Sequence, residues 1–122
     1  MRYAIFGDIH ANLEALETVL YDASQKGCTD YVCIGDIVGY NANPVECLNT
    51  VRDMDCPVVK GNHDEEAILN TSLDGLNPLA KKAMEWTRAQ LNEENRKWLG
   101  DLKMMRQVRD FTIVHALSLI HI

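Results

Sequence analysis

Three short apolar runs in the first half of the chain each end in a glycine followed by an acid or an amide. The runs span residues 3–6, 31–34 and 57–60, and Gly7-Asp8, Gly35-Asp36 and Gly61-Asn62 follow them. Apolar runs of this length bounded by turn residues are typical of buried strands. This repeat constrains the fold most strongly, because it sets where the chain turns and puts a polar side chain at each turn.

Helical patterns separate these predicted strands. Asn12 precedes apolar residues at spacings of three and four, and Gly27 ends that stretch. Asn43-Pro44 opens a second helix, with the asparagine as N-cap, the proline in the first turn and Glu46 reaching back as in a capping box. The alternation of strands and helices predicts βαβ units with right-handed crossovers and a largely parallel sheet, which is an α/β fold.

The second half of the sequence is more helical. Helices are expected from Asn77-Pro78 to about residue 91, and from Asn92 to about residue 102. The acidic run 64–66 is interpreted as the first turn of another helix. Residues 111–114 form a fourth predicted strand, and 104–108 form a weaker candidate joined to it through Arg109-Asp110. We expect a single domain over residues 1–116.

Charge and composition exclude several classes of protein. Twelve basic and eighteen acidic residues give a net charge of -6, which disfavours a nucleic-acid-binding patch. No apolar run reaches the roughly 18 residues of a membrane span, and the N-terminus has no signal-peptide pattern. We therefore expect a cytoplasmic protein without a membrane partner; the sequence does not indicate the oligomeric state. The cysteines lack C-x-x-C spacing, so they are interpreted as structural free thiols: Cys28, Cys33, Cys47 and Cys56.

Metal-competent side chains follow all four main predicted strands. Because the carboxyl ends of parallel strands share one edge of a sheet, these side chains are expected to converge there. Carboxylate, imidazole and amide ligands suit manganese, iron, zinc or a similar divalent ion. Any one of these residues alone is more often a turn or partly exposed residue, but the joint pattern favours a site. The residues are Asp8, His10, Asp36, Asn62, His63, Asp64 and His115.

Two other interpretations are weaker. A Rossmann-type nucleotide site requires G-x-G-x-x-G after the first strand, where this chain has Gly7-Asp8-Ile9-His10. A substrate platform of aromatic and methionine side chains is possible, but such residues in amphipathic helices usually belong to the core. We therefore assign the following residues to the core: Met84, Trp86, Trp98, Met104 and Met105.

In these motifs the chain resembles the calcineurin-like metallophosphoesterases, and more loosely the small prokaryotic members of that family. The family pattern is D-x-H, G-D-x-x, G-N-H-[DE], an isolated histidine and then G-H-x-H. The first four parts match in order across nearly the whole chain. They are Gly7-Asp8-Ile9-His10, Gly35-Asp36-Ile37-Val38-Gly39-Tyr40, Gly61-Asn62-His63-Asp64 and Val114-His115.

The resemblance implies two divalent metal ions and a role for each matched residue. Asp8 and His10 would bind the first metal, Asp36 would bridge both, and Asn62 and His115 would bind the second. Manganese is the favoured metal, with iron, zinc and nickel as alternatives. The implied activity is hydrolysis of phosphate mono- or diesters of a small phosphoester or nucleotide substrate, by in-line attack of a metal-bridging hydroxide.

The resemblance also implies a catalytic pair next to these ligands. His63 would bind the phosphate and assist the leaving group. Asp64 would orient the ring of His63, because a carboxylate behind an imidazole fixes its tautomer and favours the form that donates a proton.

The chain departs from the family pattern after His115. The G-H-x-H motif is missing from the 122 residues, so the expected fold is the metallophosphoesterase α/β fold, incomplete at its C-terminus. Residues 117–122 match the translation of a transposon end used in preparing sequencing libraries, and we interpret them as a non-native read-through tail. Three hypotheses stay open: a metal-dependent phosphatase or phosphodiesterase, a truncated fragment of one with little or no activity, and a non-catalytic binding or scaffold module on the same fold.

Overall fold

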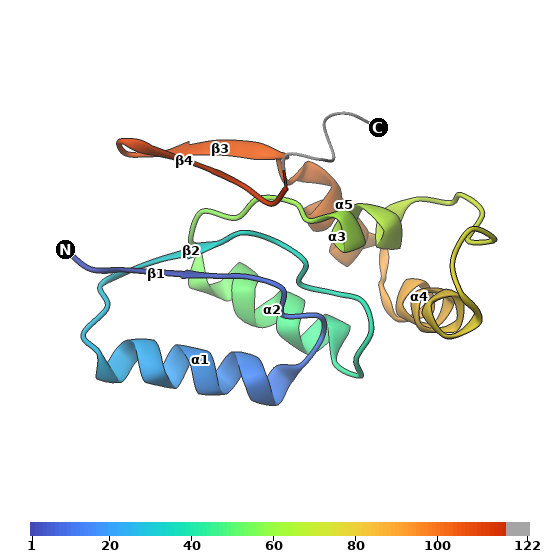
Figure 1. Cartoon of the computed structure of the whole chain (residues 1–122), viewed down its shortest axis with the longest axis horizontal. Helices are drawn as coiled ribbons and strands as arrows, with labels where there is room; N and C mark the ends of the chain where they lie inside the picture. Colours follow the sequence, from blue (N-terminus) through green and yellow to red (C-terminus); the bar gives the residue numbers. More distant parts are fainter. Residues whose placement is uncertain (117–122) are drawn as a thin grey trace.

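The computed structural model describes residues 1–116, so the predicted tail 117–122 lies outside the described residues. Strands and helices alternate in the first half, and helices followed by a hairpin make up the second half (Figure 1). The elements are β1 (Tyr3–Phe6), α1 (Leu13–Gln25), β2 (Asp30–Cys33), α2 (Pro44–Met54), α3 (Asn62–Ile68), α4 (Pro78–Gln90), α5 (Glu93–Asp101), β3 (Met105–Val108) and β4 (Phe111–Val114). This mixed arrangement confirms the predicted α/β class.

The parallel sheet is smaller than predicted. β1 and β2 pair in parallel, from Tyr3 opposite Asp30 to Phe6 opposite Cys33. Residues 57–60 were expected to form a third strand, but they make only two isolated parallel bridges, Val58 with Cys33 and Val59 with Lys103. The segment has two neighbours, because the Val59 amide donates to the Cys33 carbonyl at 3.1 Å and the Lys60 amide donates to the Lys103 carbonyl at 2.8 Å. Neither pairing is long enough to form a ladder.

The predicted fourth strand does not join the parallel sheet either. β4 pairs antiparallel with β3, from Met105 opposite Val114 to Val108 opposite Phe111. The weaker candidate strand thus exists and is the partner of β4. Arg109 and Asp110 alone connect the two strands, and a parallel crossover needs a dozen or more residues. The left-handed backbone of Arg109, with φ of 54°, fits such a tight turn.

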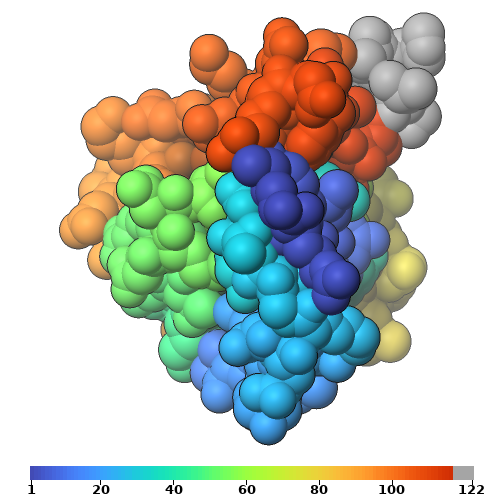
Figure 2. Space-filling view, turned by 90° about the vertical axis from the view of Figure 1, so that its left-hand side faces the viewer, coloured from blue at the N-terminus to red at the C-terminus, as the bar shows by residue number. Residues whose placement is uncertain are grey.

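The β1–β2 sheet lies between two layers. Figure 1 shows α1 and α2 along one face and the β3–β4 hairpin along the other. A large core cluster between sheet and helices includes Phe6, Leu16 and Leu48. A smaller cluster of Val32, Val59, Val108 and Ile113 joins the hairpin to the sheet. Figure 2 shows the hairpin lying directly over the N-terminal strand, which is exposed at the surface.

Local capping signals mostly act as predicted. The side chains of Asn12, Asn77 and Asn92 accept hydrogen bonds from Ala15, Ala80 and Asn95, and so cap α1, α4 and α5. The expected capping box at α2 is wrong, because the side-chain Nδ2 of Asn43 donates to the Glu46 carboxylate at 3.0 Å and the Asn43 side chain makes no capping hydrogen bond. The acidic run 64–66 does begin a helix, α3.

The core predictions hold for some residues and fail for others. Met84 is buried and Trp98 packs against the main core, but Trp86, Met104 and Met105 are exposed.

All four cysteines are free thiols, as predicted, and burial raises the pKa of Cys33 to about 12. Within residues 1–116, no helix is both long and apolar enough to cross a lipid bilayer.

Candidate metal centre

The loops that follow β1 and β2 lie side by side. The amides of Asp8, His10 and Ala11 donate to the carbonyls of Gly35, Asp36 and Ile37 at 2.8–2.9 Å. Non-glycine residues with positive φ are uncommon and cost of order 1 kcal/mol or more each. Five of the seven in the described chain lie in these loops: Asp8, His10, Ala11, Asp36 and Tyr40. The backbone is thus strained where the candidate ligands emerge.

The segment before α3 approaches the same place through two glycines. Gly35 has φ of 96°, and a Cβ atom there would lie 2.8 Å from the Val59 carbonyl oxygen. A Cβ atom on Gly61 would overlap the backbone and side chain of Asp36. Because glycine has no side chain at either position, the end of β2 and the end of residues 57–60 can come this close together.

Asp36 lies at the centre of the site and is only 3% exposed. Its Oδ2 atom is 3.1 Å from His63 Nδ1, 3.2 Å from His115 Nε2 and 3.6 Å from His10 Nε2. Its Oδ1 atom accepts a hydrogen bond from the His63 amide at 2.9 Å. Burial acts to raise the pKa of Asp36, but the hydrogen bonds from His63 and the nearby His115 outweigh it and lower the pKa overall.

The orientation of His115 fits a cation between it and Asp36. Its Nδ1 atom lies 2.8 Å from the Ile34 carbonyl oxygen, so Nδ1 carries the proton that this hydrogen bond needs. In the neutral ring, Nε2 then presents a lone pair to the carboxylate oxygen of Asp36. Two lone pairs facing each other at 3.2 Å are favourable only when a proton or a metal ion lies between them. Metal-binding histidines commonly donate their other nitrogen to a backbone carbonyl in this way.

The candidate ligand atoms form two groups that share Asp36. One comprises His10, Asp36 and His63, the other Asp8, Asp36 and His115, and the atoms of each group lie within 4.8 Å of one another. A shared carboxylate with imidazoles and a further carboxylate around it suits divalent ions such as manganese, iron or zinc. The residues therefore fit a metal centre of two neighbouring cations.

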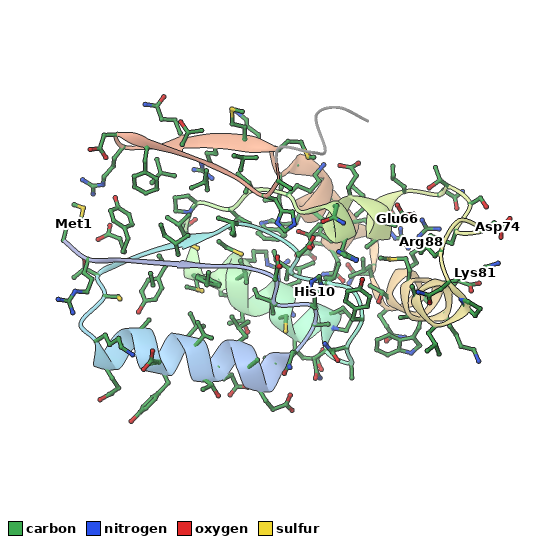
Figure 3. The ribbon with its side chains drawn as sticks, in the orientation of Figure 1. Met1, His10, Glu66, Asp74, Lys81 and Arg88 are labelled. Carbon is green, nitrogen blue, oxygen red and sulfur yellow. The ribbon has the colours of Figure 1, made fainter. Side chains whose placement is uncertain are left out.

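The remaining predicted residues lie next to this centre. Asn62 is the first residue of α3 and is exposed, and it lines a cavity of about 150 Å³ together with His63. Figure 3 shows His10 beyond the end of β1, on the side of the sheet that leads toward α4. Thus Asp8, His10, Asp36, His63 and His115 lie in one place, as the sequence predicts. Only the first three follow strands of the parallel sheet, because His63 lies in α3 and His115 follows β4 of the hairpin.

Asp64 does not orient the ring of His63, which corrects the role predicted for it. The side chain of Asp64 is fully buried, and within residues 1–116 its carboxylate bonds only to backbone amides. Those amides belong to Asp36 and Gly61 on Oδ2, and to Ile37 and Val38 on Oδ1. The ring of His63 bonds to Asp36 instead.

Sequence reasoning assigned no role to Tyr40, which lies against the centre. Its ring centroid is 4.7 Å from that of His63 and 4.9 Å from that of His10. The only sequence signal for this placement was that Tyr40 follows Gly39, whose φ of 101° lets the chain turn toward His63. Proximity to the histidines depends on the loop conformation, which a local pattern does not specify.

Comparisons with known proteins show the family and the fold. The family model described as calcineurin-like phosphoesterase matches residues 1–118. An uncharacterised protein of Methanocaldococcus jannaschii is 44% identical over 102 residues, which are 84% of this chain and 42% of that protein. A metallophosphoesterase from Sphaerobacter thermophilus superimposes with a TM-score of 0.77 at 43% identity, covering 92% of this chain and 45% of that one.

A protein from Pyrococcus horikoshii shares the fold, with a TM-score of 0.71 at 21% identity over 85% of this chain and 48% of that one. The chain therefore spans less than half the length of these relatives.

Proposed function

The chain belongs to the calcineurin-like phosphoesterase family, and we propose that it carries the main ligands of a dinuclear site for the hydrolysis of phosphate mono- or diesters. The observation that carries this proposal is the buried carboxylate of Asp36, which faces three imidazole nitrogens within 3.6 Å. Such a convergence on one oxygen atom is unfavourable for hydrogen bonding alone, because a carboxylate oxygen has few lone pairs to share.

Each ligand has a role that its chemistry supports. Following the family pattern, Asp8 and His10 would hold one cation, and Asn62 and His115 would hold the other, with Asp36 between them. In the structure the grouping differs, because His10 lies with His63 and Asp8 lies with His115 around the shared Asp36. Two bound divalent cations, with manganese favoured, would lower the pKa of a water molecule and neutralise charge on the phosphoryl oxygens. The hydrogen bond from His115 to the Ile34 carbonyl keeps its ring oriented for this task.

His63 is proposed to assist the leaving group. Its backbone amide and its Nδ1 atom both interact with Asp36, so its ring is held from two points. The hydrogen bond with Asp36 raises the pKa of His63, which favours the protonated ring. A protonated imidazole at the edge of the centre can bind a phosphoryl oxygen and donate a proton to the departing oxygen.

The 122 residues contain no G-H-x-H motif, which in the family pattern supplies two further histidines. We therefore propose that this chain alone binds its cations weakly and turns over phosphoesters slowly. Underfilled coordination lowers affinity and leaves the reacting groups less well positioned. Longer relatives that share the first four motifs should be faster.

Metal stoichiometry tests the assignment of roles. The chain is titrated with manganese beside the variants Asp36→Asn and His63→Gln, and the bound metal is measured at equilibrium. Asp36→Asn should lose most of the metal because it weakens both sites, while His63→Gln should keep it and lose hydrolysis of 4-nitrophenyl phosphate or its diester. Asp53→Asn, an exposed position on α2, is the matched control and should behave as the parent chain. Equal metal loss in the first two variants would show that these roles are wrong.

A further inference from the structure

A shallow apolar groove runs along the outer side of α4 beside the metal centre. It has a volume of about 540 Å³, within the range of small-molecule sites. Its lining includes Tyr40, Leu79, Lys82, Ala83 and Trp86. The groove therefore combines two aromatic rings, aliphatic surface and one ammonium group.

The groove is continuous with the candidate metal centre. Tyr40 and Ala83 line both the groove and the smaller cavity of about 150 Å³ that His63 and Asn62 also line. The ring of Tyr40 in turn contacts those of His63 and His10. A molecule with its phosphate at Asp36 would thus extend past Tyr40 onto α4.

Core packing does not explain the positions of the two aromatic side chains. Trp86 is 44% exposed, while Met84 and Thr87 of the same helix are buried, so the indole faces away from the core. Tyr40 is 55% exposed and has φ of 70°. A bulky residue held in this conformation and left in solvent is typical of a functional position, because the strain is not repaid by burial.

The charges on α4 add a second element of recognition. Lys81 is paired with Asp74 at 2.9 Å (Figure 3), whereas the next residue, Lys82, lines the groove. An exposed ammonium beside aromatic faces suits a ligand that has a planar ring together with anionic groups. Stacking on aromatic side chains tolerates any base, since every base has a π-face.

Building on the proposed function, we propose that this groove binds the base of a nucleotide whose phosphate group reaches the metal centre. Tyr40 and Trp86 would contact the base, and Lys82 would attract the anionic part of the ligand. The substrate class is then nucleoside phosphates, in contrast to simple sugar phosphates, which have no planar ring.

Tryptophan fluorescence tests this binding without requiring turnover. Trp98→Phe leaves Trp86 as the only tryptophan, and adenosine monophosphate should quench its emission in a saturable way. Ribose 5-phosphate has the same phosphate but no base and should give no saturable change. Tyr40→Ala should raise the dissociation constant for adenosine monophosphate by about tenfold, because one stacking partner is lost. Lys82→Gln should weaken it by a smaller factor.

The control is Tyr21→Ala, which removes an exposed tyrosine from α1 and should leave the affinity unchanged. Equal responses to adenosine monophosphate and ribose 5-phosphate, or unchanged affinity in Tyr40→Ala, would overturn the inference. The proposed function fails separately, when Asp36→Asn keeps its metal. If Asp36→Asn keeps its metal but adenosine monophosphate still quenches Trp86, the proposal of a base-binding groove stands and only the proposed metal centre is refuted.

Discussion

The carboxylate of Asp64 joins two stretches of backbone. Its four hydrogen bonds reach Asp36, Ile37 and Val38 in the loop after β2, and Gly61 at the start of α3. Burial raises the pKa of Asp64 to about 6, and the amides of Gly61, Val38 and Ile37 act in the opposite direction. Asp64 thereby holds the strained backbone of Asp36, whose φ is 58°, although it touches no ligand atom.

Asp64→Asn should therefore destabilise the fold. The new amide group would face two backbone N–H donors and could accept from neither, and a hydrogen bond to a charged group contributes roughly 1.5–3 kcal/mol. We expect the free energy of unfolding in urea to fall by about 3 kcal/mol. The exposed Asp53→Asn should stay within about 0.5 kcal/mol of the parent chain. A loss below about 1 kcal/mol for Asp64→Asn would contradict this account.

At the scale of elements, the helices were more predictable than the strands. Asn12, Asn77 and Asn92 cap helices through a side chain and an amide three residues apart, so the local sequence contains the whole interaction. Residues 57–60 have the composition of a strand, but they make only single bridges to Cys33 and to Lys103, both distant in the sequence. Composition cannot specify how far the pairing with such distant partners extends.

The candidate site divides in the same way. The convergence of Asp8, Asp36, His63 and His115 was predicted, but the stated reason holds only for Asp8 and Asp36, which follow the parallel strands β1 and β2. His63 lies in α3, and His115 follows β4 of the antiparallel hairpin. The role of Asp64 was not, because it depends on which backbone amides surround a buried carboxylate. Trp86 was misassigned to the core since helical periodicity alone does not show where a neighbouring element fails to cover a helix.

The β3–β4 hairpin determines where His115 lies, which leads to a prediction at the element scale. Ile113 is buried against Val32, Val59 and Val108, two residues before His115. Ile113→Ala should lower the free energy of unfolding by about 2–4 kcal/mol and weaken metal binding, because the hairpin loses its main anchor. The exposed neighbour Thr112→Ala should do neither. Urea denaturation and a manganese titration measure the two effects. Unchanged metal affinity in Ile113→Ala would show that the packing of the hairpin does not determine metal binding at the site.

The metal centre brings together parts of the molecule that lie far apart in the sequence. Its candidate ligands come from the loop after β1, the loop after β2, the start of α3 and the residue after β4. The strained loop backbones oppose the fold at this place. A cation here would offset the repulsion between carboxylates and tie these four segments together.

Manganese should therefore stabilise the whole chain, on the basis of the proposed function. A ligand that binds only the folded state at 100 times its dissociation constant adds about 2.7 kcal/mol. For a domain of this size that corresponds to a rise in melting temperature of roughly 10 °C. Thermal unfolding followed by circular dichroism, with manganese and then with excess EDTA, measures the rise and its reversal. Asp36→Asn should show almost no rise because both cations lose their shared ligand, while the exposed Asp53→Asn should match the parent chain. An equal rise in Asp36→Asn would place the stabilising metal elsewhere on this acidic surface and would remove Asp36 from the centre of the site.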